Sequence, residues 1–521
     1  MAIPSAALRY LGRQNSGIFS YVRLASSAAT SPKDESNNID IENAKPYDQV
    51  PEVNLGAFKN IFFMVDAIVR GTIQKPWDSM TKMRQDFGPI WKQKFGKYVM
   101  VSVADPQLFE TVLRNEGKYP RRGPFEPWLA HREERNLALG VLLHEGADWH
   151  RNRTALSKRM MRPREVASYT DAVNDVITDL TNKVVRARDG HKKDNIVPDI
   201  ENILFTWSLD SACAIILNKK LNLLDDKPHP EAQEFIQAVH DMFDTTLWLF
   251  FVPTRVHQKF NSWIWKKHAR AWDIIYATAK KLIDEKMNDV TKRMAAGEEI
   301  DTEEADFVTY MVAQGSLEID EIYANATELL AAAVDTTSNT FLWTLYCVAK
   351  YPHAQTALYE EIKRVVPAGE TPTHEHINRM PYLKAVLRET MRLHPPVINI
   401  SRIVEKEVTV AGYHMPAGTL FAGQTWLMGR DPEYFEDPLE FQPERWIRDE
   451  KEHFYGFKSL PFGYGPRMCI GKRLAELEIH LALARLCQKF ILEPTTDVEA
   501  KMTTIVAPDR PLNLKFIDRT P

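Results

Sequence analysis

The chain has 521 residues, of which 44% are hydrophobic and 26% are charged, a balance typical of a folded globular protein rather than a disordered one. The formal net charge is −4, so the composition indicates no overall electrostatic attraction to nucleic acid. The four cysteines, Cys213, Cys347, Cys469 and Cys487, are far apart in the sequence. This spacing argues against a paired-cysteine metal site or a disulfide scaffold, and it is typical of a reducing compartment.

The first 33 residues contain no acidic side chain, whereas Arg9, Arg13 and Arg23 are spread among alanine, leucine and many serines. An arginine-rich, serine-rich and acid-free leader is typical of a mitochondrial transit peptide, although a disordered tail can share this composition by chance. No apolar run reaches the roughly 18 residues of a membrane-spanning helix. The sequence therefore predicts a transit peptide at 1–33, a polar linker at 34–54 and one folded domain at 55–521.

The next elements in chain order predict a small β region followed by a long helical region. Alternating β-branched and aromatic residues at 98–103 predict one strand of a short hairpin. Between residues 105 and 400 the apolar residues recur with helical spacing, most clearly at 166–185 and 269–287. Strand-like segments return near the C-terminus, at 408–410, 419–422 and 512–516. The fold class is therefore expected to be mainly α with small β-sheets.

Six consecutive apolar residues at 247–252 precede Pro253, and Trp263 and Trp265 follow shortly afterwards. One interpretation is a buried core segment. The other is that 247–265 forms an apolar lip that dips into a membrane surface, where a lipophilic ligand would enter. Both interpretations remain open on the sequence.

A long apolar helix is predicted at about 319–349, and in its middle two small residues, Ala332 and Ala333, are followed by Asp335 and Thr336. Small side chains let a ligand approach the helix backbone closely. The Thr336 hydroxyl can turn from the backbone toward such a ligand, and the Asp335 carboxyl can relay protons to it. The alternative is that both polar side chains bond back to their own helix.

Glu389 and Arg392 are three residues apart on a predicted helix, where opposite charges share one face and can form a buried pair. Arg445, in a Pro-Glu-Arg-Trp segment, is a candidate third member of this cluster. A satisfied buried cluster has a structural role, because it fixes the position of whatever packs against it. A Glu-x-x-Arg pair alone is common on surface helices, so the inference rests on its place ahead of the loop described next.

A glycine-rich loop at 461–473 brings Cys469 to the start of another apolar helix. Glycines such as Gly465 let the backbone pass close to a flat ligand, while free N–H groups at a helix start favour a thiolate. Arg467 can meet an anionic group of the same ligand, and Phe462 can pack below the sulfur. A thiolate with these neighbours suits the axial ligand of a haem iron. The other interpretation is an ordinary buried cysteine on a loop.

The chain resembles the cytochromes P450, whose haem-binding loop has the pattern seen here as Phe462-x-x-Gly465-x-Arg467-x-Cys469-x-Gly471. The resemblance covers roughly residues 50–515, nearly the whole mature chain. It implies the cytochrome P450 fold for a catalytic domain at 55–521. It also implies haem b (iron protoporphyrin IX) between the helix that contains Thr336 and the helix that follows Cys469. Alanine stands at position 333, where the family most often has glycine.

The resemblance also implies which residues hold the cofactor. Cys469 is the expected iron ligand, and Arg467, Trp149, Arg153 and Arg402 are the expected partners of the haem propionates. Trp149 and Arg153 lie one turn apart on one helix face. Taken singly, each of these last residues is also explained as an ordinary surface or core residue.

Within the mitochondrial branch, the chain resembles the sterol 27-hydroxylase and vitamin D hydroxylase group in four stretches, at 116–121, 282–286, 334–339 and 475–479. That group implies hydroxylation of a sterol, secosteroid or retinoid by O2, with Thr336 and Asp335 handling oxygen and protons. The resemblance also implies electrons from NADPH through ferredoxin reductase and ferredoxin, and a location on the matrix side of the inner mitochondrial membrane. The expected substrate-lining residues are Val397, Ile398, Asn399, Trp128 and Ile505.

Lys384 and Arg388 are a basic pair one turn apart on the helix of the Glu389 cluster, and Lys472 and Arg473 add positive charge beside the cysteine. A basic patch on a net-acidic protein suits an acidic ferredoxin that docks near the thiolate. The alternative is a solvated basic face.

Two other classes of function are compatible with parts of these patterns. A haem-thiolate isomerase, dehydratase or desaturase keeps the fold and changes the chemistry, and NADPH-dependent O2 uptake separates the isomerase or dehydratase from a monooxygenase. A haem carrier or gas sensor has no catalytic activity and no use for a ferredoxin patch, so reduction of the haem by ferredoxin would argue against it.

Overall fold

The computed structural model describes residues 43–53, 74–95, 98–123, 125–191, 194–227, 229–298, 301, 305–447 and 455–519. The predicted transit peptide at 1–33 lies outside the described residues, as does the predicted linker before residue 43. Among the helices of the described part, none is long and apolar enough to span a membrane.

Helices form most of the molecule, as the apolar spacing predicts. They are α3 (Pro76–Phe87), α4 (Pro106–Arg114), α5 (Glu126–Arg135), α6 (Gly146–Met161), α7 (Pro163–Ala167), α8 (Thr170–His191), α9 (Ile200–Ile216), α10 (Pro230–Leu249), α11 (Thr254–Lys259), α12 (Trp263–Ala295), α13 (Phe307–Gln314), α14 (Ile319–Lys350), α15 (Pro352–Val365), α16 (His374–Asn378), α17 (Pro381–Leu393), α18 (Thr425–Met428) and α19 (Lys472–Lys489), with 3-10 turns η2 (Tyr47–Gln49), η4 (Pro443–Trp446) and η5 (Gly456–Lys458). The two predicted amphipathic stretches lie mainly in α8 and within α12, and the long apolar helix is α14.

The strands are short: β1 (Ile90–Phe95), β2 (Tyr98–Val103), β3 (Ile196–Val197), β4 (Ile400–Ile403), β5 (Val408–Val410), β6 (Tyr413–Met415), β7 (Leu420–Gly423), β8 (Phe490–Pro494), β9 (Ala500–Met502), β10 (Val506–Pro508) and β11 (Leu514–Asp518). β1 and β2 form the predicted antiparallel hairpin, and a four-stranded sheet continues in the order β1-β2-β7-β4, with β2 and β7 parallel. The other sheets are β3-β11-β8, β5-β6 and β9-β10. The mainly α class with small sheets is confirmed.

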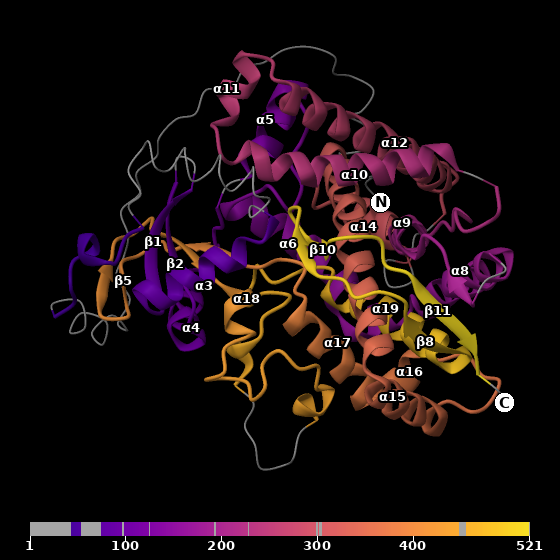
Figure 1. Ribbon diagram of the computed structural model, residues 1–521. Coiled ribbons are helices and arrows are strands. Elements are labelled where there is room, and N and C mark those ends of the chain that lie inside the picture. The colour runs from indigo at the N-terminus through magenta and orange to yellow at the C-terminus, as the bar shows by residue number, and fades with distance from the viewer. Residues whose placement is uncertain are drawn as a thin grey trace.

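α14 runs through the middle of the molecule, with α10 and α12 across one end and β1, β2 and β5 to one side (Figure 1). It is buried along almost its whole length, as expected for a central helix. Its neighbours in the main core include α9, α10, α12, α17 and α19. The β region has a core of its own, formed by residues such as Val101, Phe109 and Phe421.

Residues 43–53 differ from the predicted linker. Lys45 forms a bridge with Tyr413, Glu52 forms a bridge with Lys92, and Val50 is only 2% exposed in the core of the β region. The described part of the predicted linker at 34–54 therefore packs against the β region.

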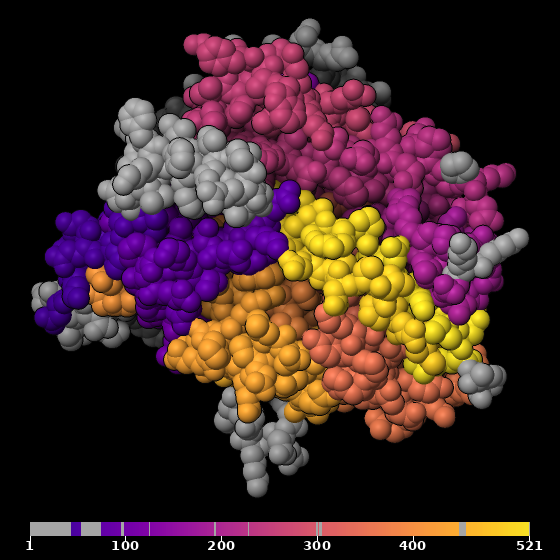
Figure 2. Space-filling model, in the orientation of Figure 1, coloured from indigo at the N-terminus to yellow at the C-terminus, as the bar shows by residue number. Residues whose placement is uncertain are grey.

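The C-terminal segment (yellow) occupies the surface between the N-terminal β region (indigo) and the helices coloured magenta (Figure 2). This segment contacts elements that are far from it in the sequence. β11 pairs with β3, and the Thr504 hydroxyl donates to the Phe243 carbonyl of α10 (2.5 Å).

Candidate active site

A cavity of about 440 Å³ lies where α14 meets the cysteine-containing loop. α14 contributes small and hydroxyl side chains, the loop contributes the sulfur, and α6, α9 and β4 contribute to the sides. The predicted site residues that border it are Trp149, Arg153, Thr336, Val397, Asn399, Arg402, Phe462, Arg467 and Cys469. Segments that are far apart in the sequence therefore meet at one cavity.

The loop that carries Cys469 is held in shape by its own backbone and by a neighbouring carboxylate. The Cys469 N–H donates to the Phe462 carbonyl (2.8 Å). Gly465 has a φ of 71°, and a Cβ at this position would collide with the Glu116 carboxylate. Glycine is therefore required here by both conformation and space. α19 begins at Lys472, so the sulfur lies just ahead of its first turn.

The Cys469 side chain is accessible because it faces the cavity, although it lies deep within the molecule. Burial raises the pKa of this thiol, while the N–H groups of Gly471 and Lys472 and the guanidinium of Arg153 favour the thiolate. A coordinated metal ion removes the proton from such a thiol. The other three cysteines are buried and do not border the cavity.

Behind the loop, Glu389 holds two arginines in a buried cluster. Arg392 donates to both carboxylate oxygens (2.7 and 2.8 Å), and Arg445 Nε donates to one of them (2.9 Å). The Trp446 indole and the Gln442 N–H complete the set (2.8 and 3.0 Å). The Glu389 and Arg392 side chains are fully buried. Their charges are compensated by these contacts and by the carbonyls of Gly429, Pro438 and Glu440, which accept hydrogen bonds from Arg392. Because α17 packs against α14 and α19, the cluster supports two of the helices that border the cavity.

The part of α14 that borders the cavity includes Ala332, Ala333 and Thr336. The Thr336 hydroxyl donates to the Ala332 carbonyl (2.7 Å), which is the back-bonding that the sequence left as an alternative. From α9, the Ser208 hydroxyl donates to the Ala333 carbonyl (3.1 Å). The two alanines leave the space in front of Thr336 open.

Asp335 has a different environment from the one expected. It does not border the cavity, and its buried carboxylate points to α10, where His240 Nε2 lies 3.1 Å from Asp335 Oδ1. Successive residues of a helix are separated by about 100°, so Asp335 and Thr336 cannot face the same way. Direct contact of Asp335 with a ligand in the cavity would need its side chain to turn.

Four arginines border one side of the cavity, namely Arg122, Arg153, Arg402 and Arg467. Within the described part of the chain, three of them form no ion pair, because only Arg402 contacts a carboxylate, that of Glu116 (2.5 Å). Burial lowers the pKa of Arg467 to about 9 and the pKa values of Arg122 and Arg153 to about 10. Buried guanidinium groups that lack an acidic partner, as those of Arg122, Arg153 and Arg467 do among the described residues, are suited to bind the carboxylates of an anionic ligand such as haem.

The contacts of these arginines refine the sequence predictions. Arg467 donates to the Pro120 carbonyl (2.7 Å) and lies over the Trp149 ring at 4.2 Å, which holds the guanidinium at the cavity edge. The charge of Arg402 is already compensated by Glu116. To bind a propionate as predicted, Arg402 would have to contact Glu116 and the propionate together, or give up its contact with Glu116. Arg122 was not predicted, although it directly follows the 116–121 stretch that resembles the family.

The five predicted substrate contacts divide into two groups. Val397 and Asn399 border the cavity. Ile398 packs in the core beside the α3 and α18 tryptophans, Trp128 donates its indole N–H to a threonine of α10 (2.9 Å), and Ile505 is 3% exposed in the main core. These three do not border the cavity, because packing against neighbouring elements holds their side chains elsewhere.

The four predicted docking residues lie on two helices that are in contact, with Lys384 and Arg388 on α17 and Lys472 and Arg473 on α19. Burial raises the pKa of the nearby Glu476, and all four cations act in the opposite direction, which places them around one carboxyl. Arg388 and Arg473 are exposed. The two helices therefore present one basic surface near the cysteine.

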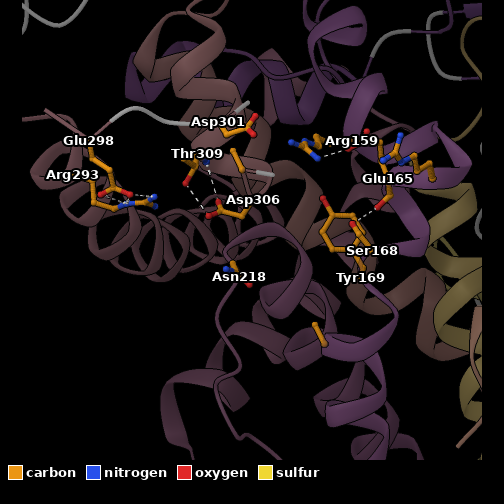
Figure 3. Close-up of a pocket in the computed structure, with 13 residues that line it drawn as sticks. Arg159, Glu165, Ser168, Tyr169, Asn218, Arg293, Glu298, Asp301, Asp306 and Thr309 are labelled. Carbon is orange, nitrogen blue, oxygen red and sulfur yellow. Dashed lines mark hydrogen bonds and ion pairs between the residues drawn. The ribbon is translucent and has the colours of Figure 1, made fainter. Parts of the chain in front are cut away.

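A larger cavity of about 740 Å³ lies elsewhere, among α6, α7, α8, α12 and α13 (Figure 3). Charged side chains around it pair with one another, including Arg293 with Glu298 and Arg159 with Glu165, and Asp306 accepts from Thr309. It contains no cysteine and lies away from the Cys469 loop. This polar cavity is therefore not the candidate active site.

Comparisons with known proteins agree with this geometry. The cytochrome P450 family model matches residues 56–516. Human mitochondrial sterol 26-hydroxylase is 36% identical over 468 residues, which cover 88% of this chain and 87% of the relative. Rat mitochondrial 1,25-dihydroxyvitamin D(3) 24-hydroxylase is 35% identical over 467 residues, covering 89% and 87%. Human mitochondrial 25-hydroxyvitamin D-1 alpha hydroxylase is 34% identical over 463 residues, covering 88% and 91%. The chain therefore belongs to the cytochrome P450 family of haem-dependent monooxygenases.

Proposed function

We propose that this monooxygenase hydroxylates a lipophilic sterol, secosteroid or retinoid with electrons from NADPH, delivered through ferredoxin reductase and ferredoxin. The observation that carries the proposal is the accessible Cys469 thiol, which shares one cavity with Thr336 and with three arginines that lack acidic partners. The substrate class is supported by the apolar lining and by relatives named for sterol and vitamin D compounds.

In this proposal Cys469 binds the haem iron, and Arg122, Arg153 and Arg467 bind the propionate carboxylates. Trp149 supports Arg467 from below. When bound, the haem supplies the oxygen-activating chemistry, with the thiolate favouring O–O cleavage. The protein itself would hold Cys469 and the three arginines in fixed positions, exclude bulk water from the cavity and supply protons.

Thr336 is proposed to present a hydroxyl at the oxygen side of the cavity. Its present bond to the Ala332 carbonyl is local, so a rotation about one side-chain torsion exchanges it for a partner in the cavity. Asp335, the next residue on the helix, is proposed to supply the proton that this hydroxyl passes on. Burial raises the pKa of Asp335, which favours a carboxyl group able to take up and release a proton.

We propose that an acidic ferredoxin docks on the basic surface formed by Lys384, Arg388, Lys472 and Arg473. The patch lies on the helix that leads from the cysteine loop and on the helix that contains Glu389, so electrons would enter close to the sulfur. Opposite charges steer such encounters and make the rate depend on ionic strength.

The segment 247–265, from the end of α10 to the start of α12, is proposed as a peripheral membrane contact on the matrix side of the inner mitochondrial membrane. Val252, Val256, Phe260 and Trp263 are exposed, with Phe260 at 73% and Trp263 at 70%. Exposed aromatic side chains next to basic ones suit an anionic lipid surface. The expected result of changing Phe260 and Trp263 together to aspartate is weaker sedimentation with anionic liposomes. Unaltered sedimentation would argue against this contact.

Residues 1–33 are proposed as the transit peptide.

The decisive test is Cys469→Ser. Loss of the thiolate should abolish the red-shifted carbonyl absorption band of the reduced protein, while Cys487→Ser, a buried cysteine away from the cavity, should keep it. If the band survives Cys469→Ser, the ligand assignment is wrong.

The substrate class is tested by a spectral-shift screen of sterols, vitamin D compounds and retinoids on the ferric protein. NADPH-dependent O2 uptake is then measured with each ligand that binds.

A further inference from the structure

A histidine on a different helix is the sole polar partner of the Asp335 carboxylate within the described part of the chain. His240 of α10 places Nε2 at 3.1 Å from Asp335 Oδ1, and neither atom has another hydrogen-bond partner there. The Asp335 side chain is 8% exposed, whereas that of His240 is 29% exposed. The pair therefore leads from a buried carboxylate to a side chain that reaches solvent.

The imidazole is held in place by its surroundings. The Phe205 ring of α9 packs edge-on against it, with ring centroids 4.4 Å apart. Charged groups near it come from each neighbouring helix: Asp241 and Asp244 of α10, Glu201 of α9, Asp335 of α14, and Lys267 of α12, which pairs with Asp241 (3.0 Å). The balance of these charges is acidic, which favours the protonated imidazole.

The directions in which the surroundings shift the pKa values of the two partners support a shared proton. Burial lowers the pKa of His240, but the ion pair with Asp335 and the charges of Asp244 and Asp241 outweigh burial, so the pKa is raised above its ordinary value. Burial raises the pKa of Asp335, and His240 only partly offsets this effect. A carboxyl group with a raised pKa beside an imidazolium is suited to receive a proton from it.

We propose that His240 is the residue that loads Asp335 with protons from solvent and holds its carboxyl group turned away from the cavity between deliveries. The imidazolium gives its Nε2 proton to Asp335 Oδ1, leaving a neutral imidazole and a carboxylic acid. The carboxylic acid, freed of the charge attraction, turns toward Thr336 and releases the proton there. The carboxylate then returns, and the imidazole takes a new proton from solvent. This inference rests on the proposed role of Asp335 and Thr336, and His240 is a positioning and proton-supplying residue because it acts through Asp335.

The pair can be tested without measuring turnover. In the full chain carrying ¹³C-labelled histidine, the resonance that disappears in His240→Gln identifies His240, and its titration is compared between the unmodified protein and Asp335→Asn. Loss of the neighbouring anion should lower the pKa of His240. An unchanged titration curve would overturn the pairing.

The proton supply is tested by the pH profile of coupling, measured as product formed per NADPH consumed. His240→Gln can still accept and donate hydrogen bonds but carries no extra proton, so coupling should fall about tenfold near neutral pH, with the spectral-shift affinity for substrate unchanged. His240→Lys, which restores a cation, should recover part of the coupling and shift its decline to higher pH. His353→Gln, an exposed histidine on α15, is the matched control.

Coupling in His240→Gln equal to that of the unmodified protein at every pH would overturn this inference alone. Survival of the red-shifted carbonyl band in Cys469→Ser would overturn the proposed function instead, and it would leave the His240 titration unaffected. The two failures are therefore distinguishable.

Discussion

Two buried carboxylates on adjoining helices differ in the number and kind of their hydrogen-bond partners. Glu389 of α17 accepts hydrogen bonds from Arg392, Arg445, a tryptophan indole and a backbone N–H, so its oxygens are saturated by partners. Asp335 of α14 has one titratable partner, His240, among the described residues. A saturated carboxylate is locked in position, whereas one with a single titratable partner can gain a proton and turn. The difference separates the rigid support of the cysteine loop from the side of the cavity where protons are expected to move.

The largest effect of a single substitution is expected at the Glu389 cluster, which supports the cysteine loop. Glu389→Gln leaves the buried Arg392 and the partly buried Arg445 without their counter-charge, so the stability of the folded protein should fall by about 3–5 kcal/mol. Thermal unfolding and the fraction of protein that retains haem are the measurements. Glu375→Gln on α16 changes an exposed carboxyl group and should have little effect. Equal stability of the two variants would mean that the cluster is not a structural support.

In the part of α14 that borders the cavity, Thr336→Ala removes the hydroxyl that is proposed to rotate toward the cavity. Product formed per NADPH should fall about tenfold or more, because oxygen activation continues without an ordered proton donor. Thr336→Ser keeps the hydroxyl and should retain most of the coupling. If alanine couples as well as serine does, proton delivery does not use this residue.

The basic surface beside the rigid cluster should affect electron delivery alone. Lys384→Ala combined with Arg388→Ala should lower ferredoxin-supported turnover several-fold and leave the substrate-induced spectral shift unchanged, because the two cations are outside the cavity. The loss should diminish as salt is added, since screening weakens the same attraction in the unmodified protein. Lys292→Ala, an exposed basic residue of α12, serves as the control. Turnover that is insensitive to both the mutations and ionic strength would rule out this docking surface.

A third buried carboxyl group sharpens the comparison, because Glu478 of α19 borders the cavity and forms no hydrogen bond or ion pair within the described residues. Burial raises its pKa to about 8. The folded protein therefore holds this proton more tightly than the unfolded chain, and stability falls as the pH rises from about 4.5 toward 8. Glu478→Gln should remove that part of the decline and raise the melting temperature at pH 8 by a few degrees, with a smaller difference at pH 6. A melting temperature that depends on pH identically in both proteins would contradict the raised pKa.

Several features of this molecule follow from local sequence. The apolar spacing at 319–349 matches α14 almost residue for residue, and the alternation at 98–103 matches β2, because periodicity records which face of an element is buried. The Cys469 loop and the Glu389–Arg392 pair were likewise evident, since their members are close together in the chain. The burial of Val50 was not evident from the sequence, because a polar composition does not reveal where one apolar side chain finds a partner.

Other features depend on contacts between distant segments, and the tertiary structure alone decided them. Asp335 faces α10 rather than the cavity because a histidine about a hundred residues earlier is packed beside it, Arg402 is occupied by Glu116, and Ile398 turns into the core. Sequence motifs state which groups are available for binding and catalysis. The direction in which each side chain points, and whether its charge already has a partner, is set by packing and electrostatics among residues that the motifs do not contain.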